Sequence, residues 1–202
     1  MLIMTYAEIK RKVLELINQY SIAGEVISPA YNNQSDYISR IPGLINDAVL
    51  RIRTEVKLIE GSCALTGGVK QGSMRRYGLP GECRRIKTGG VYRIVGGDWQ
   101  PTANYRLLGN YGILLPDDGA EYEVEYYCRT PECLPNDPFD AYDIDEEPEI
   151  LTAACYYAAA MLILNDNEFE YAALYNEYQR RVDGMASQPT AEISPILDVY
   201  GF

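Results

Sequence analysis

The chain has 202 residues, 47% of them hydrophobic, which is enough for one large domain or two small ones with a sizeable core. Its net charge of -11 is divided unevenly: residues 1–114 hold 15 Lys/Arg against 9 Asp/Glu, and residues 115–202 hold 3 against 20. No apolar run approaches the roughly 20 residues that span a membrane, and Glu8 and Lys10 come too early for a signal peptide. We therefore expect a soluble protein, made in the cytoplasm, whose charge asymmetry calls for a partner.

The residue types exclude much of the usual catalytic chemistry. Histidine is absent, which removes the commonest general base, the usual transition-metal ligand and every Ser-His or Cys-His dyad. The five cysteines are an odd number without Cys-x-x-Cys spacing, which favours reduced thiols: Cys63, Cys83, Cys128, Cys133 and Cys155. Tyrosine is abundant, with 18 residues, and suits either surfaces buried in an assembly or the edge of a core.

Residues 1–57 are predicted to form two helices. Thr5 and Glu8 have the spacing of a capping box, and apolar residues recur at helical spacing as far as Tyr20, so the first helix should end near residues 21–24. Pro42 lies inside the second helix, where the unbroken phase favours a bend over a break. The stripe of this second helix stays in phase for five turns: Ile38, Ile41, Ile45, Ala48, Ile52 and Val56.

Residues 58–131 are predicted to form a β-rich insertion, because they hold most of the glycines and their apolar residues come in short runs between turns. Val91–Val95 and a strand after Trp99 are expected to pair across Gly96 and Gly97. The clearest strand follows a turn at residues 116–119. Its carboxylates alternate with apolar residues and therefore share one face: Glu121, Glu123 and Glu125.

Residues 132–185 are expected to form an acidic loop and an antiparallel helical hairpin. Pro148, preceded by carboxylates, is typical of a helix N-terminus, and a break at residues 165–167 separates two apolar stripes. Residues 186–202 lack a helical period but keep apolar side chains, which indicates an extended C-terminal arm. The predicted fold class is thus α+β: a helical bundle, made of the two N-terminal helices and the hairpin, with a β-rich middle insertion and an extended C-terminal tail.

An acidic cluster between residues 137 and 149 is the best candidate for a metal or acid/base site: Asp137, Asp140, Asp143, Asp145, Glu146, Glu147 and Glu149. It lacks the residue order of a calcium loop and any histidine, so a solvated loop before a helix N-terminus is the simpler interpretation. A carboxylate pair for glycoside hydrolysis is an alternative, although the sequence singles out no pair. We expect no cofactor, no metal and no catalytic residues.

A basic stretch with interleaved aromatic residues lies in the β-rich insertion. Three interpretations stay open: binding of nucleic acid, contact with the acidic half of another subunit, and a solvated sheet face. The negative charge of the whole chain argues against a free-standing DNA-binding protein. The cations of the stretch are Lys70, Arg75, Arg76, Arg84, Arg85, Lys87, Arg93 and Arg106.

The order of these features resembles the head-to-tail adaptor, or connector, proteins of tailed bacteriophages, and the resemblance spans nearly the whole chain. It implies a helical bundle with a β insertion and a structural, non-enzymatic protein of the virion, assembled in the host cytoplasm. The resemblance rests on the helix from Thr5, the helical sequence DYISRIPGLINDA over residues 36–48, the Leu79-Pro80 turn, the Glu123–Tyr127 strand leading to Pro131, and the terminal hairpin with its tail.

The resemblance also implies partners: a homo-oligomeric ring, commonly of twelve subunits, with the portal protein above it, a tail or nozzle protein below it, DNA passing through it and no membrane. In such a ring, Glu121, Glu123 and Glu125 are expected to face the channel and repel DNA phosphates. The residues expected at subunit interfaces are Arg84, Arg85 and the apolar side chains of the arm: Ile193, Ile196, Leu197, Val199, Tyr200 and Phe202.

Two other functions remain as alternatives. The first is a non-enzymatic nucleic-acid or protein-binding module that uses the basic β region, and its affinity for nucleic acid would fall steeply with salt. The second is a metal-dependent hydrolase built on the acidic cluster, which would require a divalent ion or a carboxylate pair.

Overall fold

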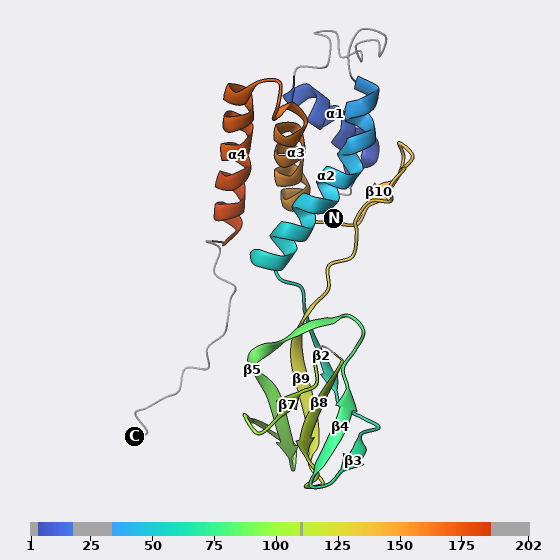
Figure 1. Cartoon of the computed structure of the whole chain (residues 1–202), viewed down its shortest axis with the longest axis vertical. Coiled ribbons are helices and arrows are strands. Elements are labelled where there is room, and N and C mark those ends of the chain that lie inside the picture. The colour runs from blue at the N-terminus through green and yellow to red at the C-terminus, as the bar shows by residue number, and fades with distance from the viewer. Residues whose placement is uncertain (1–3, 18–33, 110, 187–202) are drawn as a thin grey trace, which may run out of the picture. The chain divides into compact units, whose positions relative to one another are not determined.

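The computed structural model describes residues 4–17, 34–109 and 111–186, and the chain divides into two compact units (Figure 1). The helical unit comprises Met1–Lys57 and Glu132–Phe202, and the β unit comprises Leu58–Pro131. This mixture of helices and strands confirms the α+β class. The C-terminal arm, with the interface residues predicted there, lies outside the described residues.

Helix α1 (Tyr6–Leu16) begins at the predicted capping box. The Glu8 backbone N–H donates to Thr5 Oγ1 at 3.4 Å, and the Thr5 N–H donates to Glu8 Oε2 at 2.8 Å. The helix ends at Leu16 with Ile17 as its C-cap, so the end predicted near residues 21–24 was too late. At φ -98° and ψ 17° Ile17 has left the helical conformation, and the sequence continues with asparagine, a weak helix former.

Helix α2 (Gln34–Glu55) is the predicted long helix, and it runs without interruption through Pro42. The predicted stripe is largely buried, with Ile41, Ile45 and Ala48 at 0% exposure. Two short strands lie in the same unit: β1 (Met4–Thr5), which precedes α1, pairs with β10 (Asp143–Ile144) of the acidic loop. The N-terminal segment and the acidic loop therefore hold each other in place.

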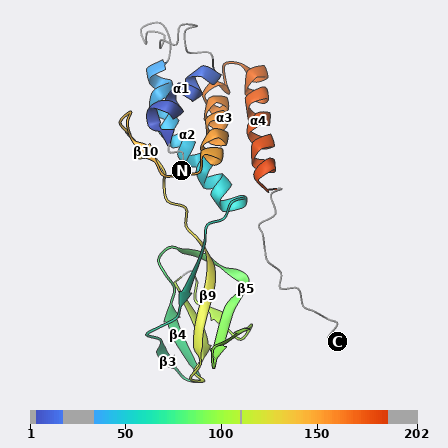
Figure 2. The same ribbon diagram turned by 180° about the vertical axis from the view of Figure 1, so that it is seen from behind.

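Helix α3 (Pro148–Ile163) and helix α4 (Glu168–Ala186) form the predicted hairpin, and α3 contacts α1, α2 and α4 (Figure 2). The sequence predicted one inner stripe on α3, but buried residues surround it on all sides, as in a helix at the centre of a core. They are Ile150, Leu151, Ala153, Ala154, Cys155, Tyr157, Ala158, Ala159, Ala160, Leu162 and Ile163. The run of alanines allows three helices to approach α3 closely.

The β unit consists of two four-stranded antiparallel sheets. The first has the order β2 (Glu60–Ala64), β9 (Glu121–Cys128), β5 (Cys83–Val95) and β6 (Asp98–Pro101). The second has the order β3 (Val69–Gln71), β4 (Met74–Gly78), β8 (Gly112–Pro116) and β7 (Arg106–Leu107). Buried side chains from both sheets form one core, separate from the core of the helical unit.

The hairpin of β5 and β6 confirms the predicted pairing across two glycines. Val95 pairs with Asp98, and Gly96 and Gly97 between them have φ angles of 60° and 93°. A two-residue hairpin turn of this kind requires positive φ at both central positions, which glycine adopts without strain. This turn sets the pairing register of β5 with β6.

Candidate assembly surfaces

The carboxylates of β9 lie on one face of the first sheet, as their alternation predicted. Tyr122 and Val124, between them, point into the core with 2% and 0% exposure. Glu121 is exposed, whereas Glu123 and Glu125 are half-buried by neighbouring strands. The strand therefore carries a row of three carboxylates on its outer side.

Cations lie beside this row, so the face is less negative than the sequence suggested. Lys87, on β5, places its Nζ 3.0 Å from a carboxylate oxygen of Glu60 and 3.6 Å from one of Glu125. The Tyr92 hydroxyl donates to the same Glu125 carboxylate at 3.4 Å. The hydrogen bond that Lys87 donates to Glu60 is the main reason that the pKa of Lys87 is raised. Of the three carboxylates, Glu125 is thus already engaged within the sheet.

An aromatic pair borders the carboxylate row. Tyr92 is the cross-strand neighbour of Glu123, and its ring centroid lies 5.6 Å from that of Trp99. Trp99 is 51% exposed, and Ile94 stands between it and Glu121 in the register of the sheet. The sequence grouped these aromatic residues with the basic stretch, but cross-strand pairing places them on the acidic face.

The structure does not gather the basic stretch into one patch. Lys70 and Arg75 both pair with Asp117, at 2.8 and 2.9 Å, and their hydrogen bonds hold the pKa of this carboxyl below its usual value. Arg93 pairs with Asp118 at 2.8 Å on the other sheet. Acidic residues of the turn between β8 and β9 thus engage three of the candidate cations.

The two arginines predicted at an interface lie at the start of β5. Arg85 is exposed and stacks over the Tyr127 ring, with 4.8 Å from its guanidinium carbon to the ring centroid. Arg84 is half-buried. The remaining cations, Arg76 on β4 and Arg106 on β7, are exposed on the second sheet, where both are cross-strand neighbours of Leu114. Both add exposed positive charge to that sheet.

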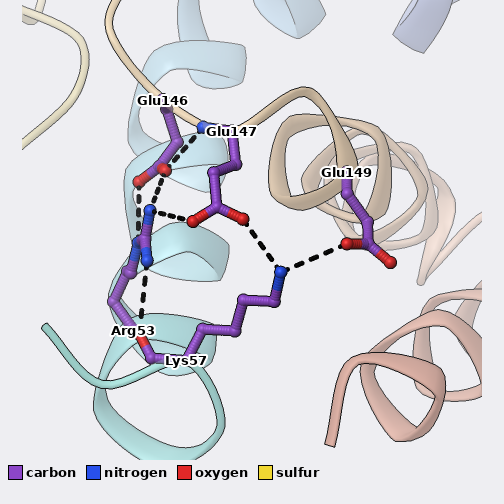
Figure 3. A network of polar contacts seen from close by, with 5 residues as sticks. All are labelled: Arg53, Lys57, Glu146, Glu147 and Glu149. Atoms are coloured by element: carbon purple, nitrogen blue, oxygen red, sulfur yellow. Dashed lines mark hydrogen bonds and ion pairs between the residues drawn. The ribbon is translucent and has the colours of Figure 1, made fainter. Parts of the chain in front are cut away.

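Three carboxylates of the acidic cluster are engaged with the end of α2 (Figure 3). Arg53 donates to both oxygens of Glu146, at 3.2 and 2.5 Å, and to Glu147 at 3.0 Å. Lys57 donates to Glu147 at 2.9 Å and to Glu149 at 3.2 Å. The arrangement joins cations at the C-terminal end of α2 to carboxylates at the N-terminal end of α3, so both helix dipoles are favourably placed.

The pKa shifts in this network favour the charged forms of its members, as expected for ion pairs that hold two helix ends together. The hydrogen bond from Lys57 is the first cause that lowers the pKa of Glu147, and the same bond raises the pKa of Lys57. Elsewhere in the cluster, Lys10 on α1 lies 2.6 Å from Asp140. Across the described ranges, no group of three or more Cys, Asp or Glu side chains is placed to hold a metal ion.

Sequence reasoning missed the partners of these carboxylates. Arg53 and Lys57 are four residues apart, at the end of a predicted helix, and the acidic residues precede the predicted start of another. That combination was a usable signal, because cations favour helix C-termini and carboxylates favour N-termini. Nothing in the local pattern, however, says that these two helix ends meet.

A match to a protein family agrees with the resemblance seen in the sequence. None of the helices in the described part of the chain is long and apolar enough to cross a membrane. Among solved structures, the chain is similar to one described as the neck of an empty GTA particle computed with C6 symmetry, with 14% identity and a TM-score of 0.27 over 88% of this chain and 95% of the other. No curated protein matches. Residues 4–196 match the family described as SU10 adaptor protein. The likeness to phage head-to-tail adaptors is therefore confirmed, and the chain belongs to the SU10 adaptor protein family.

Proposed function

We propose that this chain is a structural component of a phage virion that forms a ring at the head-to-tail junction, below the portal, through which DNA passes. The family match over residues 4–196 carries this proposal. Twelve subunits, a portal protein on one side and a tail or nozzle protein on the other are the arrangement we infer. The chain would reach this junction by assembly in the host cytoplasm and would act without catalysis or a cofactor.

The distribution of charge supports a contact between unlike surfaces of neighbouring subunits. Residues 132–202 hold 2 Lys/Arg against 15 Asp/Glu, whereas residues 1–131 hold 16 against 14. A ring closed by head-to-tail contacts needs two different, complementary patches on each subunit. A strongly acidic segment and an exposed basic surface on the same chain meet that requirement.

The second sheet offers the basic patch for such a contact. Its outer face carries Arg76 and Arg106 on either side of Leu114, and Val69, beyond Arg76, is 65% exposed. Apolar and arginine side chains together are typical of protein interfaces. We propose that this face binds the acidic surface of a neighbouring subunit. Arg84 and Arg85 are further interface candidates. The apolar arm stays a predicted interface.

The carboxylates of β9 suit a surface that DNA passes without binding. Glu121 and Glu123 line the first sheet next to the exposed Trp99, and the turn before β9 also carries the Asp118 carboxylate. Fixed negative charge lowers the local concentration of DNA phosphate, so a duplex slides past it without sticking. We propose that this face lines the channel.

Nucleic-acid binding by the basic stretch is less favoured, because several of its cations are already engaged. Lys70, Arg75, Lys87 and Arg93 each lie within 4 Å of a carboxylate oxygen of the same unit. Release of counterions from phosphates, which drives such binding, would first require these ion pairs to break. For the hydrolase alternative, the described part of the chain contains no group of three or more Cys, Asp or Glu side chains that could hold the divalent ion.

Sedimentation of particles from the native source tests the proposal. Lysate would be resolved on a density gradient, and this chain would be quantified by mass spectrometry in every fraction. We expect it to co-migrate with DNA-filled particles at a constant ratio of about a dozen copies to each particle. Recovery of the chain only in the small soluble fractions would overturn the virion assignment.

A further inference from the structure

Cys83 and Cys128 lie directly opposite each other at one end of the first sheet. Cys83 is the first residue of β5 and Cys128 is the last residue of β9, and the two are register partners. Neither backbone N–H is donated to the other residue: that of Cys83 goes to the Pro80 carbonyl at 2.9 Å, and that of Cys128 to the Ile59 carbonyl at 2.7 Å. The two cysteines therefore form a cross-strand pair without a backbone hydrogen bond between them.

Antiparallel strands alternate between hydrogen-bonded and non-hydrogen-bonded residue pairs. The Arg129 N–H donates to the Glu82 carbonyl at 2.7 Å, which is the bond expected to flank a non-hydrogen-bonded pair at Cys83 and Cys128. In such pairs the Cα atoms are about 4.5 Å apart and the side chains are closest. That spacing falls within the Cα range of about 4.4 to 6.8 Å in which disulfides form.

Both side chains also face the same way. Cys83 is buried in the core of the β unit, with 1% exposure, and Cys128 packs against that core. Gly61 on the neighbouring strand has no side chain, and this leaves room for the Cys128 sulfur. A Cβ at Gly61 would lie 3.1 Å from that sulfur. All five thiols are free in the structure. We propose that Cys83 and Cys128 are a disulfide-forming pair, which closes across the ends of β5 and β9 when the protein meets an oxidising disulfide compound.

The reaction is thiol–disulfide exchange with a small disulfide such as oxidised glutathione. The Cys128 thiolate attacks one sulfur of the small disulfide, breaks its S–S bond, and releases one thiolate while forming a mixed disulfide. The Cys83 thiolate then attacks the Cys128 sulfur, forms the Cys83–Cys128 bond and releases the second small thiolate. The protein loses two electrons and two protons, and the small disulfide becomes two thiols.

Burial makes this exchange slow at neutral pH and assigns the first step to Cys128. Desolvation is the main cause that raises the pKa of both thiols, so little of either is thiolate. Cys128 is the more accessible of the two and is the one that meets the reagent. The biological setting rests on the proposed function, because a virion leaves a reducing cytoplasm for an oxidising medium. The chemistry itself is testable on the purified chain.

Trypsin provides a clean test, because it separates the three cysteines of the β unit into the peptides 58–70, 77–84 and 107–129. The reduced full-length chain would be equilibrated with oxidised glutathione at pH 8, alkylated, and digested without reductant. We expect the number of alkylated cysteines to fall from five to three. A linked peptide that joins 77–84 to 107–129, lighter by two hydrogen atoms, should appear.

Cys63 is the matched control, since it packs against the same core but has Val124 as its strand partner. Cys63→Ser should still form the link and retain two alkylated cysteines. Cys83→Ser should form no link and instead carry glutathione on Cys128. Circular dichroism of each variant checks that the fold is kept. Five alkylated cysteines after equilibration, or a link through Cys63, would overturn the proposal.

Discussion

Arg53 on α2 donates two hydrogen bonds to Glu146, which lies 93 positions further along the chain. The pair is largely withdrawn from water, with side-chain exposures of 14% for Arg53 and 8% for Glu146. Glu147 shares the same guanidinium, and Lys57 extends the network to Glu149 (Figure 3). The stability of the helical unit therefore depends on the contact between the end of α2 and the start of α3.

Removing the guanidinium tests this dependence. Arg53→Ala leaves the half-buried carboxylates of Glu146 and Glu147 without their shared partner, and we expect the free energy of unfolding to fall by about 3 kcal/mol. Urea unfolding followed by circular dichroism at 222 nm measures it. Arg11→Ala is the control, because its pair with Glu15 is exposed and should contribute less than about 0.5 kcal/mol. Equal losses in both variants would contradict the role of the network.

Acid should weaken the same contact. The folded-state pKa of Glu147 lies below its ordinary value of 4.5, chiefly because Lys57 donates to it. The unfolded chain therefore binds a proton at higher pH than the folded chain does. The stability from Glu147 is complete above pH 4.5 and is lost as the pH falls through the lowered folded pKa. Glu147→Gln should remove this part of the pH dependence. Unfolding free energies between pH 6 and 3 measure the slope, and Glu15→Gln, in the exposed pair, should leave it as in the wild type.

Gly90 and Gly78 in the β unit should differ sharply in how much stability an alanine substitution costs. Gly90 is buried where the register of β5 and β9 shifts, and a Cβ there would lie 2.9 Å from the Glu125 carbonyl oxygen. Gly90→Ala should therefore push the two strands apart and cost more than about 2 kcal/mol. Gly78→Ala adds a Cβ with no atom within 4 Å and should change stability by less than about 1 kcal/mol. Thermal unfolding of the two variants distinguishes these outcomes.

The two outward carboxylates of β9 that lie nearest Trp99 should matter for the particle and not for folding. Glu121→Gln with Glu123→Gln is expected to change the unfolding free energy by less than about 1 kcal/mol, because neither carboxylate fills the core. Val124→Ala, which follows Glu123 and is fully buried, should cost about 2 kcal/mol. Particles built with the double Gln variant should release DNA more slowly in an ejection assay. Collapse of the variant monomer would instead make these carboxylates structural.

Local patterns predicted most elements of the fold. The capping box at Thr5, the α2 stripe through Pro42, the two-glycine hairpin and the alternation of β9 are all confirmed, since each depends on neighbouring residues alone. The end of α1 was misplaced because apolar spacing continues past the point where the backbone leaves the helix. The burial of α3 on more than one face was missed because its small residues look like one stripe until three helices pack around it.

Pairing between distant charges was beyond the reach of the sequence. The carboxylates of the acidic cluster looked solvated because their partners, Lys10, Arg53 and Lys57, lie far away along the chain. Likewise, the basic stretch is continuous in the sequence, but its strands belong to two different sheets. The periodicity of a sequence predicts on which face of a helix or strand a side chain lies. Which other element packs against that face depends on the topology of the fold.

The β unit begins and ends on two paired strands, because the Ile59 carbonyl accepts a hydrogen bond from the Cys128 N–H at 2.7 Å. Its entry and exit are therefore neighbours, and each unit has its own core. A module inserted in this way can be exchanged by evolution without redesign of its host. Residues 58–131 could therefore change in size and surface without disturbing the core of the helical unit.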